Sequence, residues 1–370
     1  MSAPIDKSTW KKVKFGDVVR NVNETVSGSV TTLDRAIAME HLEPGCLEVK
    51  SWGEAAETTF TRRVKPGQTL FGKRRAYQRK VAYASFDAVC SGDILTLESA
   101  DPTKLLGELL PFLCMTEPFF EHAVGTSAGS LSPRTRWSDL ASYEFLLPPI
   151  GEQKRIADLL WSVEAYVEEL RDKATSVEDL GEALVDLALR TGERSRRLGD
   201  YFTVRREVVA GTSVPNGAYL LGLENLYPRA SSPNGQLQHL DSQVAEFSAG
   251  DVLFGKLRPA LRKVAIAPAN GWCSTEIVVL RPTAVTTTEL HLVVSSNAVF
   301  REMSHGTFGS VMPRADVASL RQLPVPDLCS PPVASLLRHA ALVFSAREVV
   351  RAEISSVHAL RNELLKTVVG

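Results

Sequence analysis

The sequence predicts an α+β protein in which two similar α/β domains alternate with two long helices that form an antiparallel coiled coil. Two observations support this prediction: a duplication with a period near 180 residues, and a long heptad pattern after each copy. Along the 370 residues we expect a first domain at 1–148, a first long helix at 149–192, a second domain at 193–329 and a second long helix at 330–370.

The duplication is clearest where residues 67–98 are placed over residues 250–281, an offset of 183 without a gap. Fifteen of the 32 positions are identical, whereas unrelated segments would share roughly two. The similarity continues further along, where Pro133-Arg134 recurs as Pro313-Arg314. The period is far longer than that of a solenoid repeat, so two similar globular domains are predicted.

Within each copy, short runs rich in β-branched and aromatic residues predict strands, and longer stretches of helical periodicity predict helices. We expect helices at 104–115 and 288–303. We expect strands at 69–71, 80–84 and 94–97 in the first copy, and at 252–254, 263–266 and 277–280 in the second.

The first long helix follows Pro148-Pro149 and should end before Gly192, since proline suits a helix start and glycine a helix end. Apolar residues recur along it at positions a and d of a heptad, with a break at Lys173. These positions predict a seam formed by Ile156, Leu159, Val163, Tyr166, Leu170 and Val177, and continued by Leu180, Leu184 and Leu187.

The second long helix follows Ser330-Pro331, and Arg347 and Arg361 interrupt its seam. Its predicted seam residues include Leu336, Val343, Ile354 and Val357. Two seams of this length exceed what a domain of about 150 residues needs to cover its core. We therefore expect the helices to pair with each other, and the alternative is that each helix packs on its own domain.

Composition excludes several classes of protein. No apolar run reaches the eighteen or so residues that span a bilayer, so no membrane association is expected. Five scattered cysteines without a C-x-x-C pair predict neither a disulfide framework nor a zinc site, and they fit a reducing cytoplasm.

Two motifs resemble functional sites but lack residues that those sites require. Gly67-x4-Gly72-Lys73 is no phosphate loop, because Arg74 stands where a serine or threonine is required. Glu48-Val49-Lys50 resembles a nuclease motif but has no equivalent in the second copy.

A basic segment that occurs in both copies is the strongest chemical signal. Arginine and lysine in short turns can neutralise phosphates or donate paired hydrogen bonds to guanine. The candidate DNA-binding residues are Lys73, Arg74, Arg75, Arg79 and Lys80 in the first copy, and Lys256, Arg258, Arg262 and Lys263 in the second.

Two Gly/Ser-rich loops that end in Pro-Arg, at 127–136 and 307–314, are further candidates and contribute Arg134, Arg136 and Arg314. The alternative is that some of these cations pair with buried acids and stabilise the fold. It is most plausible for Arg79-Lys80 and Arg262-Lys263, which begin a predicted strand.

With these motifs the chain resembles the specificity subunits of type I restriction-modification systems over nearly its whole length. The resemblance rests on the segment from Gly250 to Pro259, on Cys273-Ser-Thr-Glu-Ile277, and on the entry into the first helix from Leu147 to Ile156. The second helix departs from the pattern, because the segment 326–333 lacks the Glu-Gln-Lys-Arg found at 152–155.

The resemblance implies two target-recognition domains that each read one half of a split site in double-stranded DNA. It implies that the helices set the spacing and bind two copies of a modification subunit, and it allows a restriction subunit as well. The chain itself would be non-catalytic and hold no cofactor, because S-adenosylmethionine would be bound by the modification subunit. Three alternatives remain: a specificity-type subunit of another methylation-based defence system, a fused nuclease or methyltransferase, and a coiled-coil adaptor that binds only protein.

Overall fold

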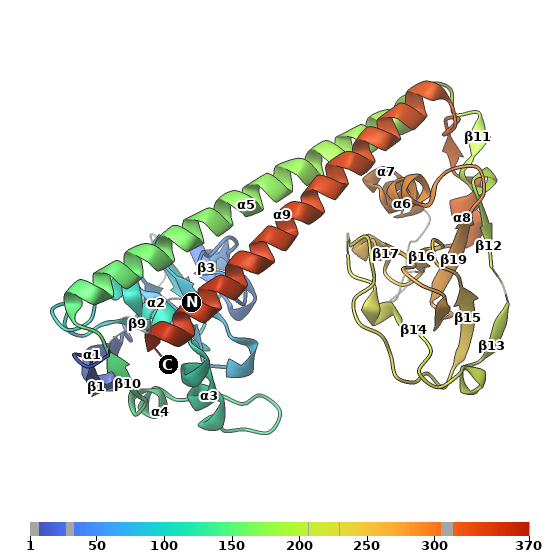
Figure 1. Cartoon of the computed structure of the whole chain (residues 1–370). Coiled ribbons are helices and arrows are strands. Elements are labelled where there is room, and N and C mark those ends of the chain that lie inside the picture. Colours follow the sequence, from blue (N-terminus) through green and yellow to red (C-terminus); the bar gives the residue numbers. More distant parts are fainter. Residues whose placement is uncertain (1–6, 27–32, 206, 229, 305–313, 370) are drawn as a thin grey trace. The chain divides into compact units, whose positions relative to one another are not determined.

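A computed structural model describes residues 7–26, 33–205, 207–228, 230–304 and 314–369. The chain divides into two compact units, residues 1–170 with 352–370 and residues 171–351. Each unit contains one of the duplicated repeats and a segment of each of the two long helices, α5 (Ile150–Arg190) and α9 (Pro331–Val369) (Figure 1). Among the described residues, no helix is long and apolar enough to cross a membrane.

In unit 1, two four-stranded sheets and short helices form the repeat (Figure 1). The first sheet is antiparallel, with the order β2 (Val19–Asn21), β9 (Ile94–Ser99), β6 (Thr69–Gly72), β7 (Val81–Tyr83). The second has the order β4 (Gly53–Glu54), β3 (Arg35–Ile37), β8 (Ala88–Cys90), β5 (Arg62–Val64). The other elements are β1 (Lys11–Lys14) paired with β10 (Glu144–Leu147), and the helices α1 (Phe15–Val18), α2 (Leu110–Cys114), α3 (Glu117–Gly125) and α4 (Trp137–Ala141).

Unit 2 has a closely similar arrangement. Its first sheet has the order β12 (Phe202–Val204), β19 (Ile277–Pro282), β16 (Val252–Gly255), β17 (Val264–Ile266). Its second has the order β13 (Val208–Ala210), β15 (Gln243–Phe247), β18 (Gly271–Ser274), β14 (Leu220–Leu221). The other elements are β11 (Arg196–Arg197) paired with β20 (Pro324–Val325), and the helices α6 (Thr287–Ser295), α7 (Asn297–Ser304) and α8 (Val317–Gln322).

The duplication predicted from the sequence is thus present in the fold. Strands β6, β7 and β9 begin and end 183 residues before β16, β17 and β19, the offset of the sequence repeat. The repeats differ at both edges of the second sheet, because β4 adds to β3 in unit 1 whereas β13 adds to β15, the equivalent of β5, in unit 2. The predicted strands of both copies are confirmed.

The two predicted helices within the repeats are only partly correct. Over 104–115 the α-helix covers Leu110–Cys114 alone, since Pro111 can occupy a first turn but not a helix interior. Over 288–303 the chain forms α6 and α7 in place of one helix. Ser296 has extended backbone between them, and its hydroxyl accepts a hydrogen bond from the N–H of Val299, which favours a new helix start.

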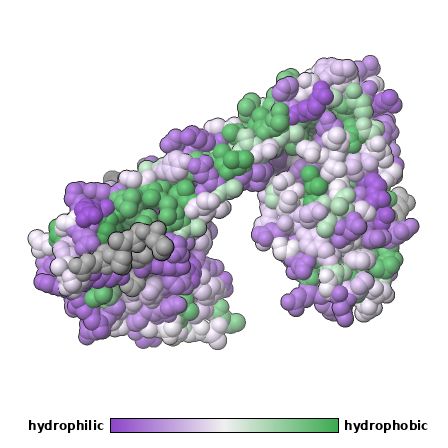
Figure 2. All heavy atoms as spheres, viewed as in Figure 1, coloured by the Kyte–Doolittle hydropathy of each residue, from purple (hydrophilic) through white to green (hydrophobic). Residues whose placement is uncertain are grey.

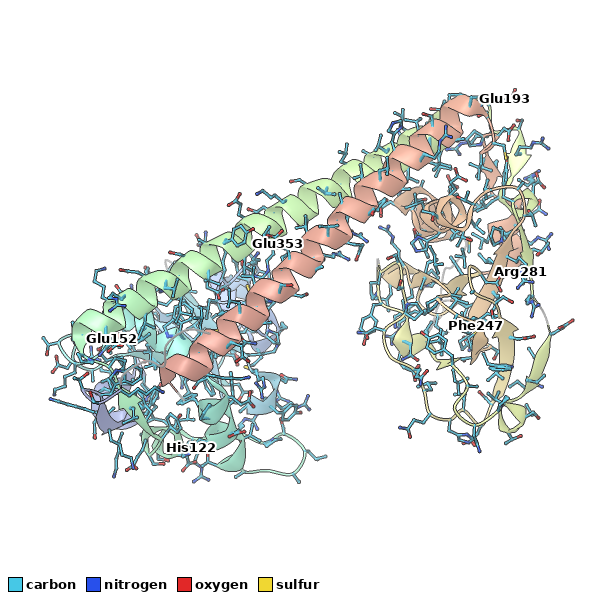
Figure 3. All side chains as sticks on the ribbon, in the orientation of Figure 1. His122, Glu152, Glu193, Phe247, Arg281 and Glu353 are labelled. Carbon is cyan, nitrogen blue, oxygen red and sulfur yellow. The ribbon has the colours of Figure 1, made fainter. Side chains whose placement is uncertain are left out.

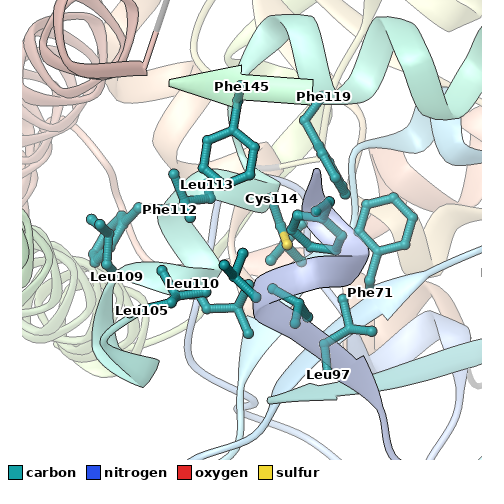
Figure 4. Packing of buried hydrophobic residues seen from close by; sticks show 14 of the residues in the cluster. Phe71, Leu97, Leu105, Leu109, Leu110, Phe112, Leu113, Cys114, Phe119 and Phe145 are labelled. Carbon is teal, nitrogen blue, oxygen red and sulfur yellow. The ribbon is translucent and has the colours of Figure 1, made fainter. Parts of the chain in front are cut away.

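Each unit has its own apolar core to which both long helices contribute. In unit 1, Phe71 and Phe119 pack edge to face with ring centroids 5.5 Å apart, beside Cys114 and Leu97 (Figure 4). Ala157 and Leu160 of α5 and Leu365 of α9 belong to this core. In unit 2 the corresponding residues from the helices are Val185, Ala188, Leu189, Val333, Leu337 and Ala340.

The expected antiparallel pairing of the long helices is confirmed within each unit. In unit 1 the first part of α5 contacts the last part of α9, through Glu164 and Arg361. In unit 2 the last part of α5 contacts the first part of α9, through Gly181 and Phe344. In each unit, the segments of both helices also pack on the repeat. The helices therefore pair with each other and pack on the domains as well.

The predicted heptad phase of α5 is wrong by one position. Leu159, Tyr166, Leu180 and Leu187, expected in the seam, are between 40% and 53% exposed. Ile156, Val163, Leu170 and Val177 are buried or half-buried beside the seam. The seam positions of α5 are buried at Ala157, Leu160, Glu164, Val167, Gly181, Val185 and Ala188 and half-buried at Arg171, Ala174 and Glu178.

Charged residues at seam positions explain why the predicted heptad phase was wrong. The apolar residues on which the prediction rested form the row next to the seam. On α9, Ile354 lies in the seam as predicted, whereas Leu336, Val343 and Val357 are half-buried beside it. Arg347 and Arg361, which interrupt the apolar pattern, are themselves seam residues. The seam of α9 is Val333, Leu337, Ala340, Phe344, Arg347, Arg351, Ile354, His358, Arg361 and Leu365.

Separate cores should make the two units respond independently to core mutations. Phe71 and Phe254 occupy equivalent strand positions and are fully buried. Phe71→Ala should lower the free energy of unfolding of unit 1 by about 3–5 kcal/mol, and Phe254→Ala should do the same to unit 2. Hydrogen exchange followed by mass spectrometry would show which peptides lose protection. Equal loss of protection in both units from either variant would contradict separate cores.

Candidate nucleic-acid interface

The basic segment of each repeat folds as a strained turn between two strands. In unit 1 it leaves β6, forms one 3₁₀ turn at Ala76–Gln78 and enters β7. Arg75 and Arg79, on either side of that turn, have left-handed backbone with φ of 54° and 56°. Arg258 and Arg262 flank Pro259–Leu261 in unit 2 with φ of 49°. These are the four non-glycine residues with positive φ in the described parts of the chain.

Left-handed backbone costs an L-residue roughly 1–2 kcal/mol, so this turn is strained in both repeats. Backbone hydrogen bonds support it: the N–H of Gln78 donates to the Arg75 carbonyl over 2.8 Å, and the N–H of Leu261 to the Arg258 carbonyl over 2.9 Å. Strain of this kind concentrates at functional sites. Because the strain occurs at equivalent positions of both copies, the turn is the candidate functional element of each repeat.

The structure brings the two predicted basic segments together in each repeat. In unit 1 the N–H of Arg75 donates to the Pro133 carbonyl over 2.7 Å, and that of Thr135 donates to the Lys73 carbonyl over 3.1 Å. In unit 2 the N–H of Ala315 donates to the Lys256 carbonyl over 2.8 Å. Of the predicted loop 307–314, only Arg314 lies within the described residues, where it bridges to Leu257.

In both repeats an acidic residue lies beneath the surface that the basic turn and the Pro-Arg segment form together. Arg134 Nε donates to Asp93 Oδ1 over 2.8 Å, and Arg74 lies 3.5 Å from the same carboxylate. Arg314 Nη2 donates to Glu276 Oε1 over 3.2 Å, and Glu276 lies 183 residues after Asp93. The hydrogen bond from Arg134 is the main cause that lowers the pKa of Asp93. These acids orient the arginines and leave a net excess of cations.

A pocket in unit 1 lies beside the half-buried Lys73. Burial lowers the pKa of Lys73, and the nearby charge of Arg62 lowers it further. The pocket has a volume of about 480 Å³. Sequence analysis missed most of its other polar and aromatic lining, because β2, β5 and α4 meet only in three dimensions. Its lining includes Asn21, Asn23, Arg62, Lys73, Arg134, Arg136 and Trp137.

Several predicted DNA-binding cations have partners within the protein. Arg79 pairs with Glu117, and Lys80 Nζ donates to the Met39 carbonyl over 2.6 Å. Lys263 Nζ donates to the Leu223 carbonyl over 2.9 Å, the equivalent contact in unit 2. The remaining candidates are exposed or half-buried: Arg136 and Arg258 are exposed, and Lys73, Arg74, Arg75 and Lys256 are half-buried.

Arg262 corrects the prediction most clearly, because it is only 8% exposed. It pairs with Glu182 of α5, and its Nη2 and Nε donate to the Ser295 carbonyl over 2.7 Å and 3.0 Å. A guanidinium so enclosed holds the turn against α5 and α6 and is not available to a phosphate. The equivalent Arg79 is half exposed and forms a surface pair.

The exposed row of α5 forms a second surface. Leu159, Tyr166, Leu180 and Leu187 are one heptad apart, with Lys173 at the remaining position. Figure 2 shows hydrophobic residues on the surface of the long helices. The Tyr166 hydroxyl donates to Glu353 of α9, which is labelled in Figure 3. We define these four exposed residues, Leu159 and Tyr166 in unit 1 and Leu180 and Leu187 in unit 2, as the α5 stripe.

No family model matches the chain. The chain is 22% identical over 194 residues to the type I restriction enzyme EcoDI specificity subunit of Escherichia coli. That match covers 50% of this chain and 43% of the subunit, so the chain spans less than half the length of this relative.

Solved structures match the fold over nearly the whole chain. One belongs to a study of complex assembly and conformational transition of the type I restriction-modification system, with a TM-score of 0.52 and 16% identity. The other is the S subunit of a type I restriction-modification system from M. genitalium, with a TM-score of 0.53 and 14% identity. Both cover 99% of this chain and 98% of the matched chain.

The two equivalent arginines of the turns should differ in their contribution to stability. Arg262→Ala should lower the free energy of unfolding of unit 2 by about 3–5 kcal/mol, because Glu182 would stay largely buried without its partner. Arg79→Ala, the matched control, should cost unit 1 about 1 kcal/mol or less, since its ion pair is exposed. Chemical denaturation measures both, and equal losses would argue against a structural role for Arg262.

In sequence over half of its length, and in fold over nearly all of it, the protein is similar to the specificity subunits of type I restriction-modification systems, which confirms the resemblance that the sequence indicates.

Proposed function

We propose that this chain is the DNA-binding specificity subunit of a type I restriction-modification system. It reads a target in two parts and directs methylation, and restriction where a nuclease subunit assembles, by partner subunits. The observation that carries the proposal is the strained cationic turn, hydrogen-bonded to a second arginine-bearing segment, at equivalent positions of both repeats. Two similar cationic surfaces in one chain suit a target with two half-sites.

Within each surface we assign the shared cations to the DNA backbone. Lys73 and Lys256 occupy equivalent positions, as do Arg134 and Arg314, so they cannot distinguish different half-sites. Cations common to both repeats fit phosphates, which are the same in every sequence.

We assign base recognition to neighbouring positions at which the repeats differ. Strand register makes Asn21 equivalent to Val204, because their partners Leu97 and Leu280 are equivalent. In the same way Arg62 corresponds to Ala245, since both pair with equivalent cysteines. Arg136 and Asp316 both precede a short helix and are the remaining contrasting pair. Unit 2 therefore lacks the amide and guanidinium groups of unit 1, since Ala245 lies in its core, and it has an acidic group in Asp316, so the two repeats would select different bases.

The chain is proposed to be non-catalytic, with S-adenosylmethionine bound by the modification subunit. Within the described residues, no group of three His, Cys, Asp or Glu side chains could hold a metal ion. The α5 stripe is proposed to contact a modification subunit, and two copies of that subunit are expected per chain. Binding of radiolabelled S-adenosylmethionine to the isolated chain would argue instead for a fused methyltransferase.

The first test separates backbone contacts from base contacts. Lys73→Ala or Lys256→Ala should weaken binding to every DNA sequence alike and reduce the slope of log K against log salt by about one. Arg136→Ala should instead relax the preference at one half-site, by about 1–3 kcal/mol per base pair. Titrations of specific and scrambled duplexes at several salt concentrations measure both effects. Unchanged affinity and slope in folded Lys73→Ala and Lys256→Ala variants would refute the assignment to phosphates.

The second test concerns the distance between half-sites, which we propose the helix pair sets. Seven residues inserted after Ala174 in α5, together with seven after Val350 in α9, keep the heptad phase of both helices. Each helix lengthens by about 10 Å, or roughly three base pairs of DNA. Sequencing of sites methylated by the assembled complex should show the same half-sites with a spacer longer by about three base pairs.

The control for this test is the same insertion in α5 alone, which displaces one side of the seam and should reduce methylation. A doubly lengthened protein that methylates only the original spacing would show that the helices do not set the distance.

A further inference from the structure

The seam between α5 and α9 carries charges that are unequally divided between the helices, with both acids on α5 and all cations except Arg171 on α9. The acidic seam residues, Glu164 and Glu178, lie on α5, and the seam of α9 contributes Arg347, Arg351 and Arg361. Glu164, Arg347 and Arg361 are each at most 5% exposed. Burial of a charge is costly unless a partner neutralises it, so these positions constrain which helix can occupy the seam.

Each seam glutamate is neutralised by the other helix. In unit 1, Arg361 Nη1 donates to Glu164 Oε1 over 2.6 Å and to the Gly45 carbonyl of the repeat over 3.1 Å. In unit 2, Glu178 Oε2 lies 3.6 Å from Arg347 Nη1 and accepts a hydrogen bond from Arg351 Nη2 over 3.2 Å. The guanidinium of Arg347 also lies over the ring of Phe344, 5.0 Å from its centroid.

The contacts in both units obey one antiparallel register. Glu178 follows Glu164 by two heptads, and Arg347 precedes Arg361 by two heptads. Gly181 opposes Phe344 in the same register, three residues beyond the Glu178–Arg347 pair on each helix. A Cβ atom at Gly181 would lie 2.7 Å from the phenylalanine ring, so the two residues fit by size.

We propose that these buried glutamate–arginine pairs specify α9 as the partner of α5, in this one register, and exclude a second copy of the chain. Leucine and alanine pack in many registers, whereas a buried charge accepts only the position that neutralises it. Buried ion pairs add little net stability compared with apolar residues, and selection of register and partner is their best-supported role.

Displacement by one heptad would leave both glutamates without arginine. In one direction Glu164 would oppose Ile354 and Glu178 would oppose Ala340, and Arg171 would oppose Arg347. In the other direction Glu178 would oppose Ile354, and Arg171 would oppose Arg361. Each shifted register therefore combines a buried unpaired carboxylate with two cations brought face to face.

Pairing with the same helix of a second copy is disfavoured in the same way. Two α5 helices would bring together four seam glutamates against two copies of Arg171. Two α9 helices would bring together only cations, because none of its seam residues from Val333 to Leu365 is acidic. Only the combination of α5 with α9 supplies an arginine for each seam glutamate.

Two variants of the full chain test the proposal. Glu164→Arg with Glu178→Arg makes every charged seam position basic on both helices, because Arg171 is already basic. Arg347→Glu with Arg361→Glu makes them largely acidic. Each variant alone should have a thermal unfolding midpoint lower by roughly 10 °C, because like charges oppose each other in the seam.

Refolded together or co-expressed, the two variants should form a complex of two chains, in which α5 of each chain pairs with α9 of the other. Light scattering coupled to size-exclusion chromatography reports the number of chains. The variant with all four substitutions should be a single chain that recovers most of the lost midpoint. The remaining loss is expected from three contacts that the substitutions do not restore, namely Arg361 with Gly45, Arg347 with Glu348 and Arg351 with Glu178.

The matched control is Asp158→Arg with Asp179→Arg, two exposed acids of α5 whose substitution changes the net charge equally. It should leave the midpoint within about 2 °C of the unsubstituted chain. The proposal is overturned if the seam variants unfold at the midpoint of this control, if the mixture gives no two-chain complex, or if the fourfold variant recovers nothing. None of these measurements uses DNA, so the outcome is independent of the proposed function.

Discussion

The helix pair depends on charges buried at positions that apolar residues usually occupy. At its ends the seam is apolar, with Leu160 and Leu365 in the core of unit 1 and Val185 and Ala340 in the core of unit 2. Apolar packing provides most of the burial but accepts many registers. The Glu164–Arg361 pair and its counterpart at Glu178 restrict that freedom. Any function that needs a fixed distance along the helices depends on this restriction.

The repeated turn shows a second constraint, because its two strained arginines do different work. The second arginine of each turn is held by the protein: Arg79 by Glu117 and the ring of Phe120, and Arg262 by Glu182 and Ser295. The first arginine, Arg75 or Arg258, closes the turn through its carbonyl. Glycine would relieve the left-handed backbone at either position, so the side chains must supply something that offsets the strain.

Local sequence patterns were sufficient to predict the repeats, their shared strands, the extent of both long helices and the antiparallel pairing. They were insufficient where the outcome depends on three-dimensional neighbours. The predicted heptad phase of α5 was wrong because Glu164 and Glu178 lie in the seam whereas Leu159 and Tyr166 are exposed. This reverses the usual pattern, and it is possible because arginines of α9 neutralise the glutamates. Likewise Asn21, Arg62 and Trp137 line the same pocket as Lys73 because of the fold, and no spacing in the sequence indicates that they lie together. Arg262 became structural through contacts with α5 and α6, distant in sequence.

Duplication explains how common and differing chemistry can coexist on one scaffold. The two repeats keep the turn, the acid beneath it and the lysine after the strand, all of which are needed to present cations in a fixed geometry. Around that shared frame, Asn21 is replaced by Val204, Arg62 by Ala245 and Arg136 by Asp316. These positions lie outside the strained turn, although Ala245 is buried in the core of unit 2 and the Asp316 side chain accepts hydrogen bonds at the start of α8. The side chains beside one turn can therefore differ while the turn itself is kept, and because each repeat has its own core, a change in one repeat need not alter the other.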